Sequence, residues 1–406
     1  MAELLESVIL GDGIQLRNRI CMGSMMRNRC TDGNKPTHAN IKHHTDRARD
    51  GAGLIVAEGT FISLNGAEWP HAPVMYNQDH SDAWAEVTSE VHKVGGKILF
   101  QPWHPGRIQN DNMPMLKESG YSVYAPSKVP AKGGKYRTLE ELPGHTDNIT
   151  EIDDPRVIVG QYRHSVSLAK SARFDGIELL AHGGYLIHNF LCSHSNTRSD
   201  QYGVLDAIIE VWGSRAVGIK ICPTDDYNDT MISYEEMKET YTYFIKELMC
   251  RDLAFINLSR RGCDVGRETD DYFRSRPRPQ GKELPPKYEP LTDFGTLIKY
   301  PKSRAMLMVN REYTVEEARD LLQRGKINLV TFARPFIYNP DLISRIKKGV
   351  PLASNTRGGK VKYGPFEDRT RITIIGRHLE GRVRLSPVRQ PAPSSRSYLI
   401  SSDNNI

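Results

Sequence analysis

Residues Ala172 to Gly203 read A-R-F-D-G-I-E-L-L-A-H-G-G-Y-L-I-H-N-F-L-C-S-H-S-N-T-R-S-D-Q-Y-G. The short apolar run Ile177 to Leu180 is followed by two glycines, a tyrosine and a polar segment that is too irregular for a plain helix. This pattern predicts a buried strand that opens into a functional loop. An ordinary strand with a glycine turn is the alternative, and the stretch by itself does not separate the two.

Seven further apolar runs alternate with amphipathic segments along the chain. They begin at Arg19, Leu54, Lys97, Val217, Phe255, Ala305 and Asn328. Helix starts are marked by Asp154-Pro155 and by the capping-box patterns Ser233-x-x-Glu236 and Thr314-x-x-Glu317. Eight strand and helix pairs predict an α/β fold, a (β/α)8 TIM barrel in a single domain over 1–352, with the active site at the carboxyl ends of the strands. An open doubly wound sheet is disfavoured because no G-x-G-x-x-G motif follows the first strand.

Three segments depart from this alternation. Pro105 to Asn148 is rich in proline and glycine and is expected to be an extended loop with a small hairpin near Tyr121 to Tyr124. Ser259 to Tyr288 is a second, polar extended loop. After Leu352 the periodicity stops, and 353–406 is expected to be an irregular, basic and poorly ordered C-terminal tail.

The 406 residues, 38% hydrophobic and 26% charged, have the composition of a soluble globular protein. No apolar run approaches the roughly 20 residues of a membrane helix, and Met1 to Ile9 lacks a signal-peptide pattern, so a cytoplasmic location and no membrane partner are expected. The net charge of +6 lies in the tail, where ten Lys/Arg and four Asp/Glu follow from Arg357 onward, which argues against a nucleic-acid partner. The six cysteines include no C-x-x-C pair, which argues against a metal site.

The residues just past each predicted strand are the candidates for a functional site. Lys220, Arg311 and Arg334 concentrate positive charge on strands five, seven and eight. The last two strands of such barrels commonly hold a phosphate, so a phosphorylated ligand is one hypothesis. Surface cations are the alternative.

Six motifs occupy these and neighbouring positions in order along the chain. They are Leu16 to Ile20 leading into Met22 to Arg27, Glu58-Gly59-Thr60, Gln101 to Arg107, Phe174-Asp175-Gly176 through Tyr185-Leu186, His194 to Arg198 with Asp200 and Tyr202-Gly203, and Ala333 to Phe336 with Asn339 to Leu342. Each motif alone is weak, but their order and spacing are specific. From about Leu4 to Leu352 the chain resembles the Old Yellow Enzyme family of FMN-dependent ene-reductases.

The resemblance implies FMN over the barrel mouth and NADPH as the electron donor. In this family hydride passes from flavin N5 to an activated alkene, and Tyr185 matches the tyrosine that gives the proton to the other carbon. Lys220 stands where the family usually has an arginine beside flavin N1 and O2. The other implied cofactor-binding residues are Ser24, Met25, Met26, Gly59, Gln101, Asn310, Arg311, Ala333 and Arg334.

The chain also departs from the family pattern. The family binds the substrate carbonyl with a His-x-x-Asn or His-x-x-His pair, whose positions here are Leu180 and Gly183, and neither has a side-chain donor. His182 lies between them, and either a local shift brings it into the substrate site or it faces elsewhere. Met26 replaces a threonine or cysteine, Asn310-Arg311 replaces a common Gly-Gly, and the family's closing segment is not recognisable in Ala353 to Ile406.

Three functions follow as hypotheses. The first is NADPH-dependent reduction of the C=C bond of an α,β-unsaturated carbonyl compound. The loss of the carbonyl-binding pair leaves open a flavin-dependent isomerase or desaturase-type tailoring enzyme of natural-product biosynthesis. The third is a non-redox barrel that binds a phosphorylated ligand. In each case we expect a small-molecule substrate or ligand and a monomer or homodimer.

Overall fold

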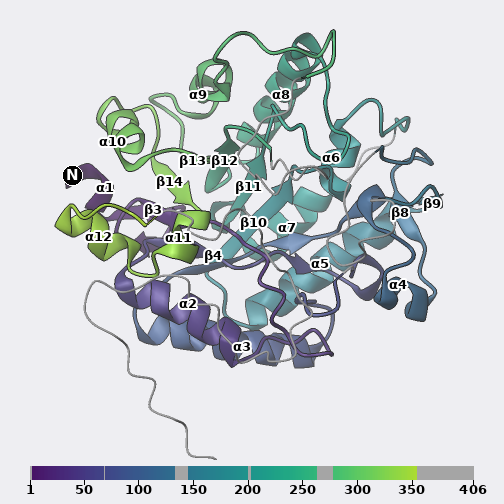
Figure 1. Cartoon of the computed structure of the whole chain (residues 1–406), viewed down its shortest axis with the longest axis horizontal. Coiled ribbons are helices and arrows are strands. Elements are labelled where there is room, and N and C mark those ends of the chain that lie inside the picture. Colours follow the sequence, from purple (N-terminus) through teal and green to yellow (C-terminus); the bar gives the residue numbers. More distant parts are fainter. Residues whose placement is uncertain (1, 68, 133–144, 200–202, 263–277, 354–406) are drawn as a thin grey trace, which may run out of the picture.

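A computed structural model describes residues 2–67, 69–132, 145–199, 203–262 and 278–353 (Figure 1). Its centre is a closed barrel of parallel strands in the order β10-β11-β12-β13-β14-β3-β4-β6. The strands are β3 (Ile20–Met22), β4 (Leu54–Val56), β6 (Ile98–Phe100), β10 (Gly176–Ala181), β11 (Val217–Ile221), β12 (Phe255–Ser259), β13 (Met306–Asn310) and β14 (Leu329–Phe332). Each overlaps a predicted apolar run, so the predicted (β/α)8 barrel is confirmed.

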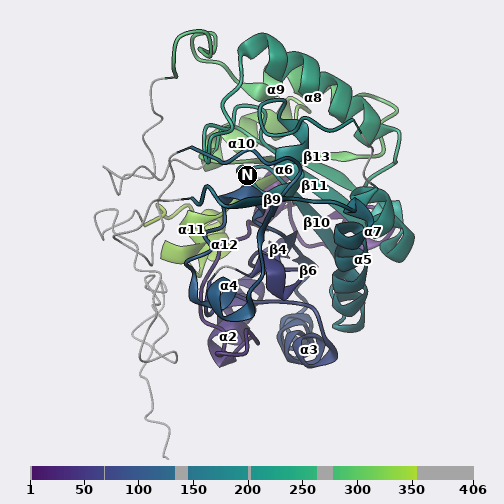
Figure 2. The ribbon, with the colours of Figure 1, turned by 90° about the vertical axis from the view of Figure 1, so that its right-hand side faces the viewer.

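Helices surround the barrel. They are α2 (His38–Asp50), α3 (Gln78–Lys93), α5 (Pro155–Ser171), α7 (Val204–Trp212), α8 (Tyr234–Met249), α9 (Pro290–Ile298), α10 (Val315–Gln323) and α12 (Leu342–Lys348). In Figure 1 and in the perpendicular view of Figure 2, α8 and α9 lie on one side of the barrel and α2 and α3 on the opposite side. Asp154 caps α5, and Thr314 and Glu317 form the predicted capping box of α10. Among the described residues, no helix has the length and apolar character needed to cross a membrane.

The long segment after the third barrel strand differs from the prediction. It contains a helix, α4 (Pro114–Ser119), and the strand β8 (Val123–Ala125). The hairpin predicted near Tyr121 to Tyr124 is wrong, because β8 pairs in parallel with β9 (Ile149–Glu151), which lies beyond the predicted loop. A local alternation of residue types cannot reveal a partner that distant in sequence.

Several parts of the predictions lie outside the described residues. These are 133–144 of the first extended loop, Asp200 and Tyr202 of the fifth motif, 263–277 of the second extended loop, and 354–406 of the tail. Other helices were not predicted either, among them α7, α9, the short helix α6 (Leu186–Leu191) and the short helix α11 (Arg334–Tyr338). The last two follow barrel strands directly and therefore shape the mouth.

The amino-terminal end of the barrel is closed by a hairpin that the sequence pattern did not reveal. Strands β1 (Val8–Leu10) and β2 (Ile14–Leu16) pair antiparallel. Leu10 and Leu16 pack with Leu54, Phe255 and Leu329 in a cluster in which these five side chains are at most 1% exposed. In the described part of the chain the hairpin therefore covers this end of the barrel, and a ligand is expected at the carboxyl ends of the strands.

The Leu16 to Ile20 motif secures this closed end. The Arg17 guanidinium donates from Nε to the Gly95 carbonyl at 2.9 Å and from Nη2 to the Val94 carbonyl at 2.7 Å. Asn18 donates to the Gly51 carbonyl at 2.7 Å and accepts from the Ile20 N–H at 3.0 Å. These bonds satisfy backbone groups of the turns that precede the first three barrel strands. The motif is thus structural.

Candidate active site

The predicted site residues form a ring at the carboxyl end of the barrel. In strand order they are Leu180, His182, Gly183 and Tyr185 at β10, Lys220 on β11, Asn310 and Arg311 at β13, Ala333 and Arg334 after β14, Ser24, Met25 and Met26 after β3, Gly59 after β4, and Gln101 after β6. Parallel strands end at the same face of a barrel, so the fold brings these positions together. The role of each residue remains a prediction.

A buried carboxylate that the sequence reasoning missed lies beneath this ring. Glu178 of β10 is 1% exposed and accepts hydrogen bonds from Gln101 Nε2 and Asn257 Nδ2, each at 2.8 Å. Because the NH₂ group of Gln101 donates to Glu178, this bond fixes the orientation of the Gln101 amide. Its Oε1 then lies beside Gly59, where an added Cβ atom would be 3.4 Å away. The signal for Glu178 was an acidic residue inside an apolar run.

Small residues keep part of the mouth free of side chains. A Cβ atom at Gly59 would come within 3.2 Å of the Trp103 ring, and one at Gly23 would come within 2.7 Å of Thr331 and 3.3 Å of Ala333. These distances are shorter than ordinary carbon contacts, so both positions require glycine or a local shift. The two glycines follow adjacent strands, β3 and β4. They allow Trp103 and Thr331 to pack closely against the backbone at the mouth.

Positive charge lies on two parts of the ring. Lys220 of β11 is 8% exposed and stands in register with Leu180. Arg311 follows β13, and Arg334 is the first residue of α11, directly after β14. The predicted concentration of cations at the carboxyl end of the barrel is therefore present.

The backbone turns directly after β13. Arg311 and Glu312 have φ angles of 77° and 58°, whereas Asn310 is not left-handed. The left-handed conformation that glycine adopts most easily is therefore found at Arg311 and Glu312. Each non-glycine residue in this conformation costs roughly 1–2 kcal/mol. Ion pairs of Glu312 with Arg261 and with Arg311, the latter at 3.7 Å, offset part of that cost.

An apolar and aromatic wall forms one rim of the mouth. Trp103 stacks on Phe61 with ring centroids 4.6 Å apart and meets the ring of Tyr185 edge-on at 4.8 Å. Leu180 and Met26 pack in the same cluster. Leu180, the residue at the first position of the carbonyl-binding pair, is thus part of an apolar surface. Trp103 belongs to the motif Gln101 to Arg107, but the sequence did not reveal that its side chain forms this aromatic wall.

The loop after β10 is held by backbone hydrogen bonds. Gly183 and Gly184 have left-handed φ angles of 77° and 72°. The Gly183 N–H donates to a carboxylate oxygen of Asp225, and the Gly184 N–H donates to Nδ1 of His188 at 3.1 Å. A Cβ atom at Gly183 would come within 2.6 Å of the Tyr185 ring. Gly183 therefore sets the position of Tyr185, and its own N–H is already used.

The donor set at this face fits FMN. Gln101 offers an oriented amide to a flavin edge, and Lys220 is a buried cation suited to the ring atoms that gain negative charge on reduction. Arg311 and Arg334 suit a phosphate. Together with the barrel, these features define a flavin-dependent oxidoreductase.

Comparisons with known proteins identify the family. A model of the NADH:flavin oxidoreductase / NADH oxidase family matches residues 3–353, and the chain belongs to this family, which includes the Old Yellow Enzymes. A probable flavin mononucleotide-dependent alkene reductase of Leishmania infantum is 30% identical over 366 residues, which cover 86% of this chain and 91% of that protein.

Solved structures agree with this assignment. The Old Yellow Enzyme homologue of Zymomonas mobilis is 28% identical with a TM-score of 0.74, covering 88% of this chain and 96% of that chain. Morphinone reductase is 26% identical with a TM-score of 0.75, covering 92% and 96%. The protein is therefore an NAD(P)H-dependent FMN oxidoreductase, and the non-redox hypothesis is wrong.

Proposed function

We propose that the protein uses NADPH to reduce the C=C bond of an α,β-unsaturated carbonyl compound. The observation that carries the proposal is the place of Tyr185, which follows β10 at the rim of the mouth with its ring against Trp103. A phenol there is held at the edge of an apolar wall, where an alkene would lie. The relative from Leishmania infantum is described as a probable alkene reductase, which supports the same class of reaction.

The site residues at the carboxyl end of the barrel would have separate roles in binding FMN and in proton transfer. FMN, when bound, supplies the hydride that it receives from NADPH. Arg311 and Arg334 would hold the phosphate, while Gln101 and Lys220 would hold the flavin edge. Tyr185 keeps its proton on Oη until the second alkene carbon takes it, because a phenol with a reference pKa of about 10 is protonated at neutral pH. The wall around Trp103 and Leu180 excludes water from this transfer.

Product analysis tests the proposal. The purified protein would be incubated with NADPH and a panel of cyclic enones and enals, and the products separated by gas chromatography. One saturated product is expected for each NADPH consumed under anaerobic conditions. NADPH consumption without a saturated product across the whole panel would contradict the proposal.

A second candidate is isomerisation or desaturation of a natural product. It is favoured by one observation: Leu180 lies in the apolar cluster and the Gly183 N–H is bonded to Asp225, so neither supplies the usual donor to a carbonyl. An isomerase converts its substrate without net consumption of NADPH, and a desaturase consumes O₂ in place of NADPH. Substrate conversion measured with and without NADPH and O₂ separates these reactions from alkene reduction.

A further inference from the structure

Asp225 is a buried carboxylate just past β11 that lies between two histidines. It is 2% exposed, and its Oδ2 is 3.5 Å from Nδ1 of His182 and 3.8 Å from Nδ1 of His188. Oδ2 accepts the Gly183 N–H, and Oδ1 accepts the Tyr227 N–H at 3.2 Å. Burial by itself raises the pKa of Asp225, but its contacts with His182, His188 and the Gly183 N–H outweigh burial and lower it. Asp225 is therefore an ionised, rigidly held acceptor.

His188 has its hydrogen bonds satisfied. Its Nδ1 accepts the Gly184 N–H at 3.1 Å, so its proton lies on Nε2, which is 3.0 Å from the Tyr241 hydroxyl. Tyr241 in turn donates to the Cys222 carbonyl at 3.2 Å. Burial lowers the pKa of His188 to about 4, so the ring is neutral. His188 thus supports the loop and has no group left for a ligand.

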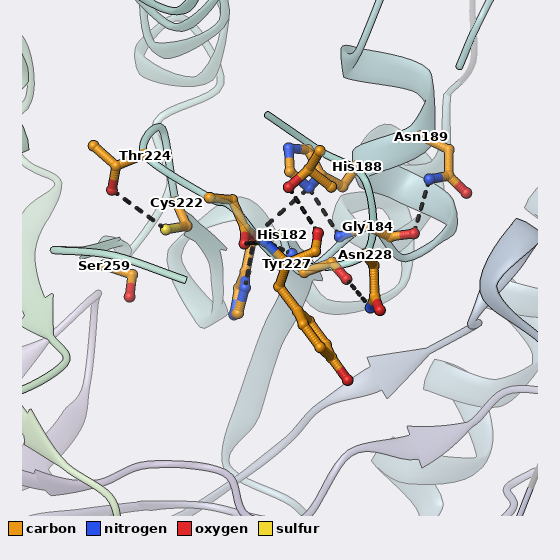
Figure 3. A network of polar contacts seen from close by, with 12 residues as sticks. His182, Gly184, His188, Asn189, Cys222, Thr224, Tyr227, Asn228 and Ser259 are labelled. Atoms are coloured by element: carbon orange, nitrogen blue, oxygen red, sulfur yellow. Dashed lines mark hydrogen bonds and ion pairs between the residues drawn. The ribbon is translucent and has the colours of Figure 1, made fainter. Parts of the chain in front are cut away.

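His182 differs from His188 in this respect. Its side chain is 15% exposed and both ring nitrogens are out of contact with solvent; Nδ1 faces Asp225 Oδ2 at 3.5 Å, whereas Nε2 has no hydrogen-bond partner in the described part of the chain. In Figure 3 the rings of His182 and His188 extend in opposite directions from the network. His182 follows Leu180 at the end of β10, and charges of Lys220 and Glu178, both in the barrel, reach its ring. A buried polar nitrogen without a partner costs about 1–3 kcal/mol, which a ligand at the mouth would recover.

Asp225 decides which nitrogen of His182 carries the proton. A carboxylate can only accept, so the tautomer with the proton on Nδ1 is favoured and Nε2 keeps its lone pair. Burial also lowers the pKa of His182, although Asp225 acts in the opposite direction, so the neutral ring is favoured. The family's carbonyl-binding pair donates, whereas Nε2 of this histidine accepts.

We propose that His182 binds the substrate through Nε2, which accepts a hydrogen bond from a hydroxyl group, and that Asp225 is its positioning residue. This inference rests on the proposed function and narrows its substrate class: an α,β-unsaturated carbonyl compound that also carries a hydroxyl group near the reacting bond. Leu180 and Gly183 have no side-chain hydrogen-bond donor. His182, which lies between them on the same loop, offers Nε2 as an acceptor instead. At Nε2 a hydroxyl group is therefore preferred over a carbonyl group, because a carbonyl oxygen can only accept a hydrogen bond.

Binding of two saturated, unreactive ligands to the oxidised holoenzyme tests this selectivity. Cyclohexanol and cyclohexanone differ in the group offered to Nε2, and their dissociation constants would be measured by ligand-observed NMR. The wild type is expected to favour the alcohol by roughly 3- to 10-fold, the ratio that one hydrogen bond supplies. His182→Phe should remove the preference, His182→Gln should retain part of it through its amide oxygen, and the exposed control His38→Gln should leave it unchanged.

The tautomer is tested separately. ¹⁵N-histidine NMR of the wild type, with the His182 signal identified by its loss in His182→Phe, should show the proton on Nδ1. Asp225→Ala should weaken the alcohol preference because the proton is no longer held on Nδ1. If that variant fails to fold, the NMR spectrum and the His182 variants still decide. A proton on Nε2, or an unchanged preference in His182→Phe, would overturn the inference.

The two proposals can fail independently. Absence of alkene reduction across the enone panel contradicts the proposed reaction, yet the ligand preference and the tautomer are measured without NADPH. Reduction of simple enones with equal efficiency in the wild type and His182→Phe, together with no ligand preference, contradicts only the role of His182.

Discussion

The two ends of this barrel use buried polar groups in opposite ways. At the amino-terminal end, Arg17, Asn18 and Asp175 direct nearly all of their polar atoms to backbone and side-chain partners of neighbouring turns. At the carboxyl end, Nε2 of His182 is buried and has no hydrogen-bond partner within the described residues. The first arrangement stabilises the fold, and the second is prepared for a ligand.

This difference separates motif residues that look equally significant in the sequence. Asp175 and Tyr185 belong to one motif, only ten positions apart. Asp175 precedes β10 and Tyr185 follows it, so the strand carries one residue to each end of the barrel. Substitutions at the closed end should change stability and spare the chemistry, and substitutions at the open end should do the reverse.

The largest effect is expected from Tyr185→Phe. Loss of a positioned proton donor should lower alkene turnover by roughly 10²- to 10⁴-fold. The ring and its contact with Trp103 remain, so the protein should keep its FMN and its rate of flavin reduction by NADPH. Stopped-flow absorbance measures the reductive and oxidative half-reactions separately. Equal loss in both half-reactions would contradict the role of Tyr185 as proton donor.

The next largest effect, on stability, is expected from Asp175→Asn at the closed end. Asp175 accepts from Lys97 Nζ, His92 Nε2 and the Ile98 N–H, each at 2.8 Å. Loss of the charge should lower the free energy of unfolding by about 2–3 kcal/mol, the range for hydrogen bonds to a charged group. Urea unfolding measures the change, and the exposed Asp153→Asn serves as the control. Turnover per folded molecule should be unchanged.

The same carboxylate predicts a pH dependence. Burial alone raises the pKa of Asp175, but the bonds from His92, Lys97 and the Ile98 N–H outweigh burial and lower it. A lowered folded-state pKa stabilises the fold fully above the unfolded value of about 4, and this stabilisation is lost as the pH falls through the folded value. The stability difference between wild type and Asp175→Asn should therefore shrink in acid. A constant difference down to the acid limit would contradict this assignment.

Lys220→Met should have a smaller effect at the open end. Removal of this buried cation should weaken FMN binding by about tenfold, because a hydrogen bond to a charged group is lost. Fluorescence titration of the apoprotein with FMN measures the dissociation constant. Lys220→Arg should bind FMN at least as tightly as the wild type, since a guanidinium offers two donors side by side. The exposed Lys326→Met is the matched control.

The smallest effect is expected from Arg173→Gly at the closed end. Arg173 is exposed and lies between α5 and β10 with a left-handed φ of 63°. Glycine removes the steric cost of this conformation but adds freedom to the unfolded chain, so a net gain of about 0.5 kcal/mol is expected. Thermal unfolding measures the gain, and Arg173→Ala, which keeps the Cβ atom, should show none.

Local signals were sufficient for the elements of the barrel. The apolar runs and the capping residues Asp154 and Thr314 act within a few residues of the structure they specify, so they placed the strands and the helix starts. The β1–β2 hairpin and the pairing of β8 with β9 were missed. Their stability comes from distant partners, and a short alternating run carries no information about such partners.

The sequence by itself determined the barrel, the family and the positions that surround its mouth, because strand periodicity and motif order are local and ordered properties of the chain. Only the tertiary structure decided what the polar residues do there. It placed Glu178 under Gln101, and it set Asp225 between His182 and His188 from a different strand end. The direction of a hydrogen bond depends on which group stands opposite, and for Gln101 and His182 that group is a carboxylate of Glu178 or Asp225, which the fold brings from a different strand end.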